Sequence, residues 1–277
     1  MREPGSYRLM ALDWGIGGLP FFQGLCAALP GADMLYLSDS GSVPYGKQSP
    51  ADLRRRLENI ASLAAGLGTG VVAVACNAMS SVLSAPRSTL AGVEVFSLIH
   101  AFTDSPLPSG RVIGLIGGVR TINSGIYQQA LERAGNRVRS RPAQELSALI
   151  EAGDFDAVPA FLEKTLAALG PIDALVLACT HYPAVSPLIQ NMAPGLEIID
   201  PGAALLDTCL RRLSGAEFNR EQDYPAAEGA RGRRTYLTTG GAEQSRRAAE
   251  RAFGFSGLSF VEMAADLAPA DIPDVTA

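Results

Sequence analysis

The chain has 277 residues, 47% of them apolar, which is enough for a packed core and excludes a disordered chain. This length suits two medium domains or one large one. The formal net charge of −5 at pH 7 argues against a nucleic acid or an anionic membrane as partner, because neither would be attracted over the whole surface.

Short apolar runs alternate along the chain with longer runs rich in Ala, Leu and Arg. Several of the short runs are apolar at nearly every position, which is typical of strands covered on both faces. The runs predict strands at 7–12, 34–37, 71–75, 93–96, 112–116, 174–178, 197–199 and 235–238, and helices that include 52–66, 144–152, 158–169 and 242–252. This alternation predicts an α/β fold built on doubly wound parallel sheets, with ligands at the carboxyl ends of the strands.

Three stretches interrupt this alternation. The Pro- and Ser-rich residues 104–110 predict a crossing between domains, and the polar residues 215–233 predict a surface loop. The arginine run 54–56 lies inside a helical stretch and predicts a solvated helix face.

The four cysteines and two histidines do not form a metal-binding pattern. No CxxC pair is present, and His100 and His181 lie far apart in the sequence, so a zinc site is not expected. The N-terminus lacks a signal-peptide pattern, and no run approaches about 20 apolar residues. We therefore expect a cytoplasmic protein without a membrane span, whose cysteines are thiols.

Two segments of the chain share one sequence pattern. Residues 71–77 and 174–180 are each an apolar strand that ends in Ala-Cys and is followed by a polar residue. The repeat suggests two pseudo-symmetric domains that face each other. A cysteine at a strand end, followed by the start of a helix, would have a lowered thiol pKa. Cys76 and Cys179 could then invert a stereocentre, one thiolate removing a proton while the opposite thiol supplies one.

A simpler interpretation of a cysteine at the end of an apolar strand is a small buried hydrophobe. Taken singly, either cysteine fits that interpretation better than a catalytic one. Cys26 and Cys209 lie in helical, apolar surroundings and are assigned to packing. The repeat of Ala-Cys-polar weakens this alternative for Cys76 and Cys179.

At these residues the sequence resembles the glutamate racemases of the aspartate/glutamate racemase superfamily. The likeness runs over nearly the whole chain, in order and at the family's spacing. The matching motifs are Ala11–Leu19, Tyr36–Asp39, Val43–Lys47, Val74–Asn77, Thr121–Tyr127, Leu146–Gly153, Ala178–Pro183, Ile199–Gly202 and Tyr236–Gly240.

The resemblance implies roles for individual residues. Cys76 and Cys179 would be the two acid/base groups, with Asp13 assisting Cys76, and His181 and Glu151 assisting Cys179. Asp39 would be a further carboxylate behind the residues that touch the substrate. The substrate site would be lined by Trp14, Pro44, Tyr45, Gly46, Asn77, Ala78, Thr121 and Thr180.

The resemblance also implies an architecture and a substrate. The active site would lie between two α/β domains, one formed by residues 1–97 with 206–277 and the other by 98–205. The substrate would be an amino acid, and no metal, pyridoxal phosphate or nucleotide would be needed. The oligomeric state stays open, a homodimer being one alternative.

Local sequence alone allows simpler roles for the assisting residues. Asp13 could form a turn before Gly15, His181 could cap a turn, and Glu151 could be a solvated residue at a helix end. The segment before Glu151 departs from the family, whose Pro-Leu-x-x-Pro is Gln144–Ala148 here.

Two further departures fall in the expected substrate pocket. Trp14 stands where the family has a serine, and Ala78 where it has a threonine. Each change removes a hydroxyl that could bind the substrate, which would cost affinity for a dicarboxylic amino acid. Trp14 could alternatively turn away and pack between the domains.

Three hypotheses follow from these motifs. The first is a glutamate racemase that supplies D-glutamate for peptidoglycan. The second is a racemase or epimerase of the same mechanism for a less polar amino acid, as Trp14 and Ala78 suggest. The third is a binding or regulatory protein that keeps the racemase fold, which the retained cysteines argue against.

Overall fold

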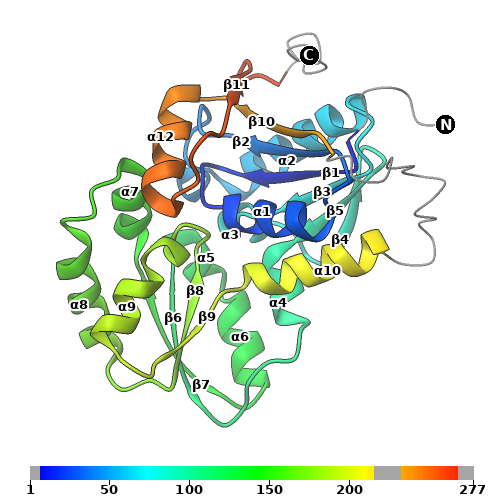
Figure 1. Cartoon of the computed structure of the whole chain (residues 1–277). Helices are drawn as coiled ribbons and strands as arrows, with labels where there is room; N and C mark the ends of the chain where they lie inside the picture. Colours follow the sequence, from blue (N-terminus) through cyan, green and yellow to red (C-terminus); the bar gives the residue numbers. More distant parts are fainter. Residues whose placement is uncertain (1–6, 215–231, 268–277) are drawn as a thin grey trace.

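The computed structural model describes residues 7–214 and 232–267, which form two β-sheets. The strands are β1 (Leu9–Asp13), β2 (Met34–Ser38), β3 (Val71–Val74), β4 (Arg87–Leu90), β5 (Val93–Ser97), β6 (Val112–Gly117), β7 (Arg137–Pro142), β8 (Ala174–Ala178), β9 (Glu197–Ile199), β10 (Arg234–Thr238) and β11 (Phe260–Glu262). One sheet has the order β11-β10-β2-β1-β3-β5-β4 and the other β7-β6-β8-β9. In Figure 1 the strands of the upper sheet run across the view and those of the lower sheet stand upright.

Helices connect most of these strands, as expected for an α/β fold. They are α1 (Leu19–Ala28), α2 (Pro50–Gly66), α3 (Asn77–Ser80), α4 (Leu98–Thr103), α5 (Val119–Ser124), α6 (Ile126–Arg133), α7 (Gln144–Ala152), α8 (Val158–Leu169), α9 (Ser186–Met192), α10 (Gly202–Ser214) and α12 (Ala242–Phe253), with short 3₁₀ helices η1 (Tyr45–Lys47) and η2 (Tyr182–Val185). All strand pairs are parallel except β4 with β5. The predicted α/β class with parallel sheets is confirmed.

Three strands were missing from the prediction, and all three lie at or beside polar edges. Strand β4 is antiparallel at one edge, β7 is an edge strand with mostly polar or exposed residues, and β11 is an edge strand too short, at three residues, to form an apolar run. An edge strand has a neighbour on one side, so its side chains can stay in water. Such strands lack the apolar run on which the prediction depended.

The larger sheet buries both faces, in the way its apolar runs predicted. Leu9 and Ala11 of β1 belong to one hydrophobic cluster with residues of α1 and α10, whereas Met10 and Leu12 belong to a second cluster with residues of α2. Successive side chains of a strand point to opposite faces, so one strand serves both clusters. Helix α2 begins after Ser49, whose side chain accepts a hydrogen bond from the Asp52 N–H.

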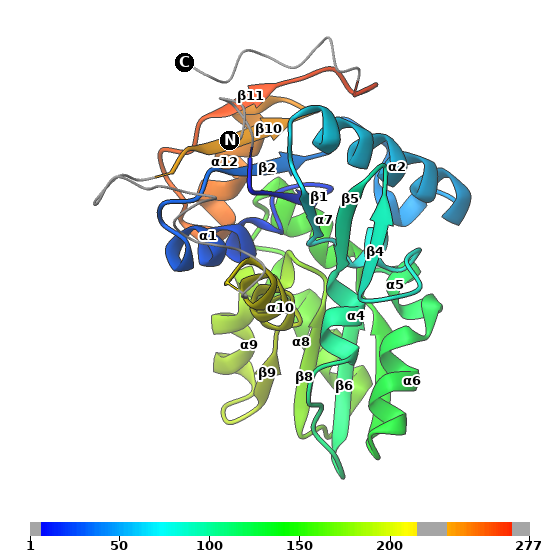
Figure 2. The ribbon, with the colours of Figure 1, turned by 90° about the vertical axis from the view of Figure 1, so that its right-hand side faces the viewer.

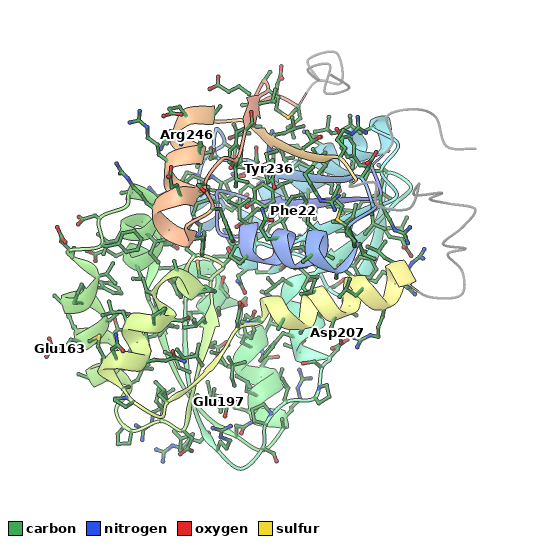
Figure 3. The ribbon with its side chains drawn as sticks, viewed as in Figure 1. Phe22, Glu163, Glu197, Asp207, Tyr236 and Arg246 are labelled. Atoms are coloured by element: carbon green, nitrogen blue, oxygen red, sulfur yellow. The ribbon has the colours of Figure 1, made fainter. Side chains whose placement is uncertain are left out.

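Aromatic rings pack α1 against the sheet. Phe22 contacts Tyr36 and Tyr236 with centroid distances of 5.5 and 5.4 Å, and its ring stands edge-on to that of Tyr236. Figure 3 shows Phe22 and Tyr236 between α1 and β10. Phe22 is fully buried, so this contact joins the N-terminal helix to a strand from the end of the chain.

The chain passes between the two sheets twice. It leaves the larger sheet after β5, passes through α4 and the predicted crossing at 104–110, and returns after β9 through α10. Helices α4 and α10 contact each other and lie between the sheets (Figures 1 and 2). Strands of the larger sheet fall within 1–97 and 206–277, and those of the smaller within 98–205. The domain bounds themselves stay a prediction, because sheet membership does not assign α4 and α10.

The remaining expectations concern the loop and the cysteines. Most of the predicted surface loop at 215–233 lies outside the described residues, because 215–231 are not described. All four cysteines are free thiols; Cys26 lies in α1 and Cys209 is buried in α10. Across the two described ranges, none of the helices is long and apolar enough to cross a membrane.

We expect Phe22→Ala to lower the free energy of unfolding by about 3–5 kcal/mol, because it leaves a cavity among packed aromatic rings. Urea unfolding followed by circular dichroism measures the change. Val43→Ala is the control, since Val43 is 60% exposed and its truncation should cost less than about 0.5 kcal/mol. Equal losses in the two variants would contradict the packing role of Phe22.

Candidate active site

A cavity of about 480 Å³ lies where the carboxyl ends of central strands from both sheets meet. Strand β1 ends at Asp13, β3 leads into Cys76, and β8 leads into Cys179. Of the expected site residues, all but Asp39 line this cavity: Asp13, Trp14, Pro44, Tyr45, Gly46, Cys76, Asn77, Ala78, Thr121, Glu151, Cys179, Thr180 and His181. The two cysteines therefore face one cavity from different sheets.

Cys76 lies in a setting that favours the neutral thiol. Burial and the negative charge of Asp13 raise the pKa of the Cys76 thiol well above its usual value. The expectation that a following helix would lower this pKa is wrong. Helix α3 has four residues, and the backbone N–H of Met79 opposes the rise without overcoming it.

Cys179 lies beside a histidine and a glutamate. His181 Nδ1 is 3.9 Å from Cys179 Sγ, and its Nε2 is 2.5 Å from Glu151 Oε2. Burial lowers the pKa of His181, but its hydrogen bonds to Cys179 and Glu151 outweigh burial and raise that pKa well above its usual value. The raised pKa favours a protonated imidazole between the carboxylate of Glu151 and the sulfur of Cys179. Glu151 thus contacts His181 and is not a solvated residue at the end of α7.

Asp13 connects the ends of the two sheets. Its Oδ2 accepts a hydrogen bond of 2.9 Å from Thr180 Oγ1, and its Oδ1 accepts one of 2.8 Å from the Trp14 N–H. Burial raises the pKa of Asp13, and the nearby charge of His181 and the hydrogen bonds only partly offset this. The Asp13 side chain therefore both accepts a hydrogen bond in the turn after β1 and lines the cavity.

Trp14 and Ala78 both lie in the cavity wall. The Trp14 indole N–H donates to the Ser42 carbonyl at 3.1 Å, and the ring packs beside the cluster that covers α2. The indole thus has its one donor occupied within the protein. Both sequence departures fall in the wall that would contact a substrate.

Asp39 lies behind this wall and holds part of it in place. It is fully buried, and its Oδ2 accepts a 2.6 Å hydrogen bond from the Tyr45 hydroxyl. Arg56 of α2 forms a two-point ion pair with the same carboxylate. The prediction of a solvated face for the arginine run is wrong at Arg56, because that side chain turns inward to pair with Asp39.

Residues of α5 and α6 support the Asn77 side of the cavity, and of these Thr121 lines it. Tyr127 donates a 2.6 Å hydrogen bond to Asn77 Oδ1 across the two sheets, and Thr121 is buried at the start of α5. The Asn77 amide is thereby oriented with its nitrogen as the free end. An oriented amide is suited to bind a carboxylate.

Sequence reasoning missed several residues that line the cavity: Lys47, Gly118, Gln144, Glu145, Ser147, Ala148 and Ala178. Four of them come from the first turns of α7, in the segment that departs from the family pattern. A β-carbon at Gly118 would lie 2.8 Å from Gln144 Oε1, so the glycine lets this side chain approach. The departure itself was the available signal for this part of the wall.

A grouping of three or more His, Cys, Asp or Glu side chains suited to a metal ion is not found in the described part of the chain. The arrangement can instead hold and move protons. It brings two thiols, three carboxylates and one imidazole to a single cavity. The pKa of the Cys76 thiol and that of the His181 imidazole are both raised, which favours the protonated form of each.

Known proteins resemble this chain in both sequence and fold. The family model for Asp/Glu/hydantoin racemases matches residues 22–209. Glutamate racemases of Pseudomonas entomophila and Aquifex aeolicus are each 34% identical, over 79% and 69% of this chain and 85% and 78% of theirs. The crystal structure of glutamate racemase from Thermus thermophilus in complex with β-chloro-D-alanine has a TM-score of 0.77 and 28% identity, covering 96% of this chain and all of that chain.

We expect Asp13→Asn to lower the pKa of the Cys76 thiol, because the substitution removes a negative charge beside it. The pH dependence of Cys76 alkylation by iodoacetamide, read by peptide mass spectrometry, measures this pKa. Asp33→Asn is the control, since Asp33 pairs with Arg233 and does not line the cavity. An alkylation profile that does not move in Asp13→Asn would contradict the electrostatic coupling.

Proposed function

The chain belongs to the Asp/Glu/hydantoin racemase family, and from this premise we propose that it is a cofactor-independent amino-acid racemase that interconverts L- and D-glutamate. The observation that carries the proposal is the pair of thiols, Cys76 and Cys179, which line one cavity from two sheets. Two acid/base groups on opposite sides of a carbon can invert it without an electron sink.

In the proposed reaction one cysteine is a thiolate and the other a thiol. The thiolate takes the α-proton of the bound amino acid and becomes a thiol. The opposite thiol then gives its proton to the other face of the carbanion and becomes a thiolate. The product has the opposite configuration, and the reverse reaction restores the starting protonation.

The surroundings of the two cysteines support one direction for each. Cys76 is favoured as a thiol by burial and by Asp13. Cys179 lies beside an imidazolium, which is the counter-ion that a thiolate needs. A resting enzyme of this kind is ready to take the proton of the L-form with Cys179 and to protonate with Cys76. The resemblance to the glutamate racemases implies the same assignment, with Cys179 taking the proton of the L-form and Cys76 that of the D-form.

The α-proton of an amino acid is very weakly acidic, so the site must stabilise the charge that develops on its removal. Asn77 and Thr121 line the cavity and offer an amide and a hydroxyl group for the α-carboxylate. We assign Asp13 to assist proton transfer at Cys76. We assign His181 and Glu151 to do so at Cys179. Pro44, Tyr45 and Gly46 would form the wall that the substrate meets.

Glutamate is the proposed substrate because the relatives that resemble this chain are glutamate racemases. One observation favours a second candidate, a less polar amino acid. Trp14 and Ala78 both line the cavity, so two hydroxyls of the family pattern are absent from the wall itself. Incubation with single amino acids in D₂O, followed by NMR of the α-position, separates the two. Exchange on other amino acids with none on glutamate would remove the first candidate.

We also propose that the enzyme works in the cytoplasm and feeds D-glutamate to peptidoglycan synthesis. Four free thiols fit a reducing compartment. The role in wall synthesis rests on the family resemblance.

We expect Cys76→Ser and Cys179→Ser each to lower racemisation of glutamate by about 10²- to 10⁴-fold, because a serine hydroxyl is a poor base at neutral pH. Circular dichroism follows the change in configuration. Cys26→Ser is the matched control, since Cys26 lies in α1 and does not line the cavity. Racemisation at the wild-type rate in both active-site variants would contradict proton transfer by Cys76 and Cys179 and would favour a binding role for these residues.

A further inference from the structure

The side chains around the cavity include more carboxylates than cationic groups, which by itself disfavours binding of a dicarboxylate. Three carboxylates line it, those of Asp13, Glu145 and Glu151, together with two side chains that can be cationic, Lys47 and His181. Glutamate brings two carboxylates and one ammonium. Its side-chain carboxylate therefore needs a donor that can outweigh the negative groups already present.

Most polar donors of the wall are already engaged. Both ring nitrogens of His181 face Cys179 and Glu151, and the Thr180 hydroxyl donates to Asp13. The Trp14 indole donates to the Ser42 carbonyl, and Ala78 has no donor at all. Neither of the two departing side chains thus offers a donor for a second carboxylate, and the Asn77 amide and the Thr121 hydroxyl are assigned to the α-carboxylate.

Lys47 is the lining cation whose charge is not engaged. Within residues 7–214 and 232–267, no acidic side chain pairs with it, whereas Arg55 and Arg56 nearby are each paired with an aspartate. Lys47 is exposed and also lines the cavity, which puts it at the rim. A cation at the rim, unpaired within the described residues, is free to bind an acidic ligand.

The backbone on both sides of Lys47 is held by contacts from elsewhere. Arg120 of α5 donates to the Tyr45 carbonyl at 3.3 Å and also to the Gln48 carbonyl, so one guanidinium spans the turn that contains Lys47. The Tyr45 hydroxyl is tied to Asp39, and the Lys47 N–H donates to the Pro44 carbonyl at 2.8 Å. A fixed backbone lowers the entropy cost of binding through this residue.

We propose that Lys47 binds the side-chain carboxylate of the substrate and makes the site selective for an acidic amino acid. This inference rests on the proposed racemase function. The Lys47 ammonium takes over the contact that the missing hydroxyls would make, with a charge-assisted hydrogen bond in place of neutral ones. Lys47 is thereby a specificity-determining residue, and it takes no part in proton transfer.

The first test is kinetic. Lys47→Met should raise KM for glutamate about tenfold and leave kcat within about threefold, because it removes binding shared by ground and transition states. Exchange of the α-proton of glutamine, which lacks the charge, should be unchanged. Lys47→Arg should restore most of the preference for glutamate, since it restores the charge. Lys164→Met is the matched control, because Lys164 lies in α8 away from the cavity.

The second test does not depend on turnover. Lys47 and Lys164 are the two lysines of the chain, so acetic anhydride labelling reads each one separately by mass spectrometry. Saturating D-glutamate should protect Lys47 at least threefold and leave Lys164 unprotected, whereas D-glutamine should protect neither.

The outcomes separate the two proposals. A wild-type enzyme that exchanges no α-proton of glutamate refutes the proposed function. An enzyme that racemises glutamate, with an unchanged KM in Lys47→Met and with Lys47 labelled equally in the presence of glutamate, overturns this inference alone.

Discussion

The hydrogen bond from Thr180 to Asp13 joins the end of β8 to the end of β1, and the site depends on the close approach of the two sheets that this bond marks. Glycines make this approach possible. A β-carbon at Gly17 would lie 2.6 Å from Thr180 Oγ1, and one at Gly15 would lie 2.9 Å from Glu151 Oε2. Larger residues would hold the sheets apart and would separate the two thiols.

This approach creates two different proton environments within one cavity. On the side of the larger sheet, burial and a carboxylate favour a neutral thiol at Cys76. On the side of the smaller sheet, Glu151 holds an imidazolium beside Cys179. A two-base reaction needs one group that can accept a proton and one that can give it. The difference between the two sheets provides that asymmetry before any substrate binds.

The departures from the family pattern lie on a separate set of contacts. The wall formed by Trp14, Ala78 and η1 touches the cavity but none of the proton-transfer hydrogen bonds of His181. The buried pair of Asp39 and Arg56 holds this wall through Tyr45. The departures at Trp14 and Ala78 therefore leave the contacts among Cys179, His181 and Glu151 in place.

The sequence by itself determined the α/β class and the buried strands, because apolar runs are local properties of the chain. The ordered set of motifs likewise indicated that Cys76 and Cys179 belong to one site. It did not reveal the polar edge strands β4 and β7, which bury too little to leave an apolar run. Only the tertiary structure decided that Arg56 turns inward and that Lys47 reaches the rim of the cavity. The tertiary structure also raises the pKa of the Cys76 thiol, through burial and the charge of Asp13. Burial and the distance to a neighbouring charge depend on contacts between residues far apart in the chain, and those contacts exist only after the sheets have packed.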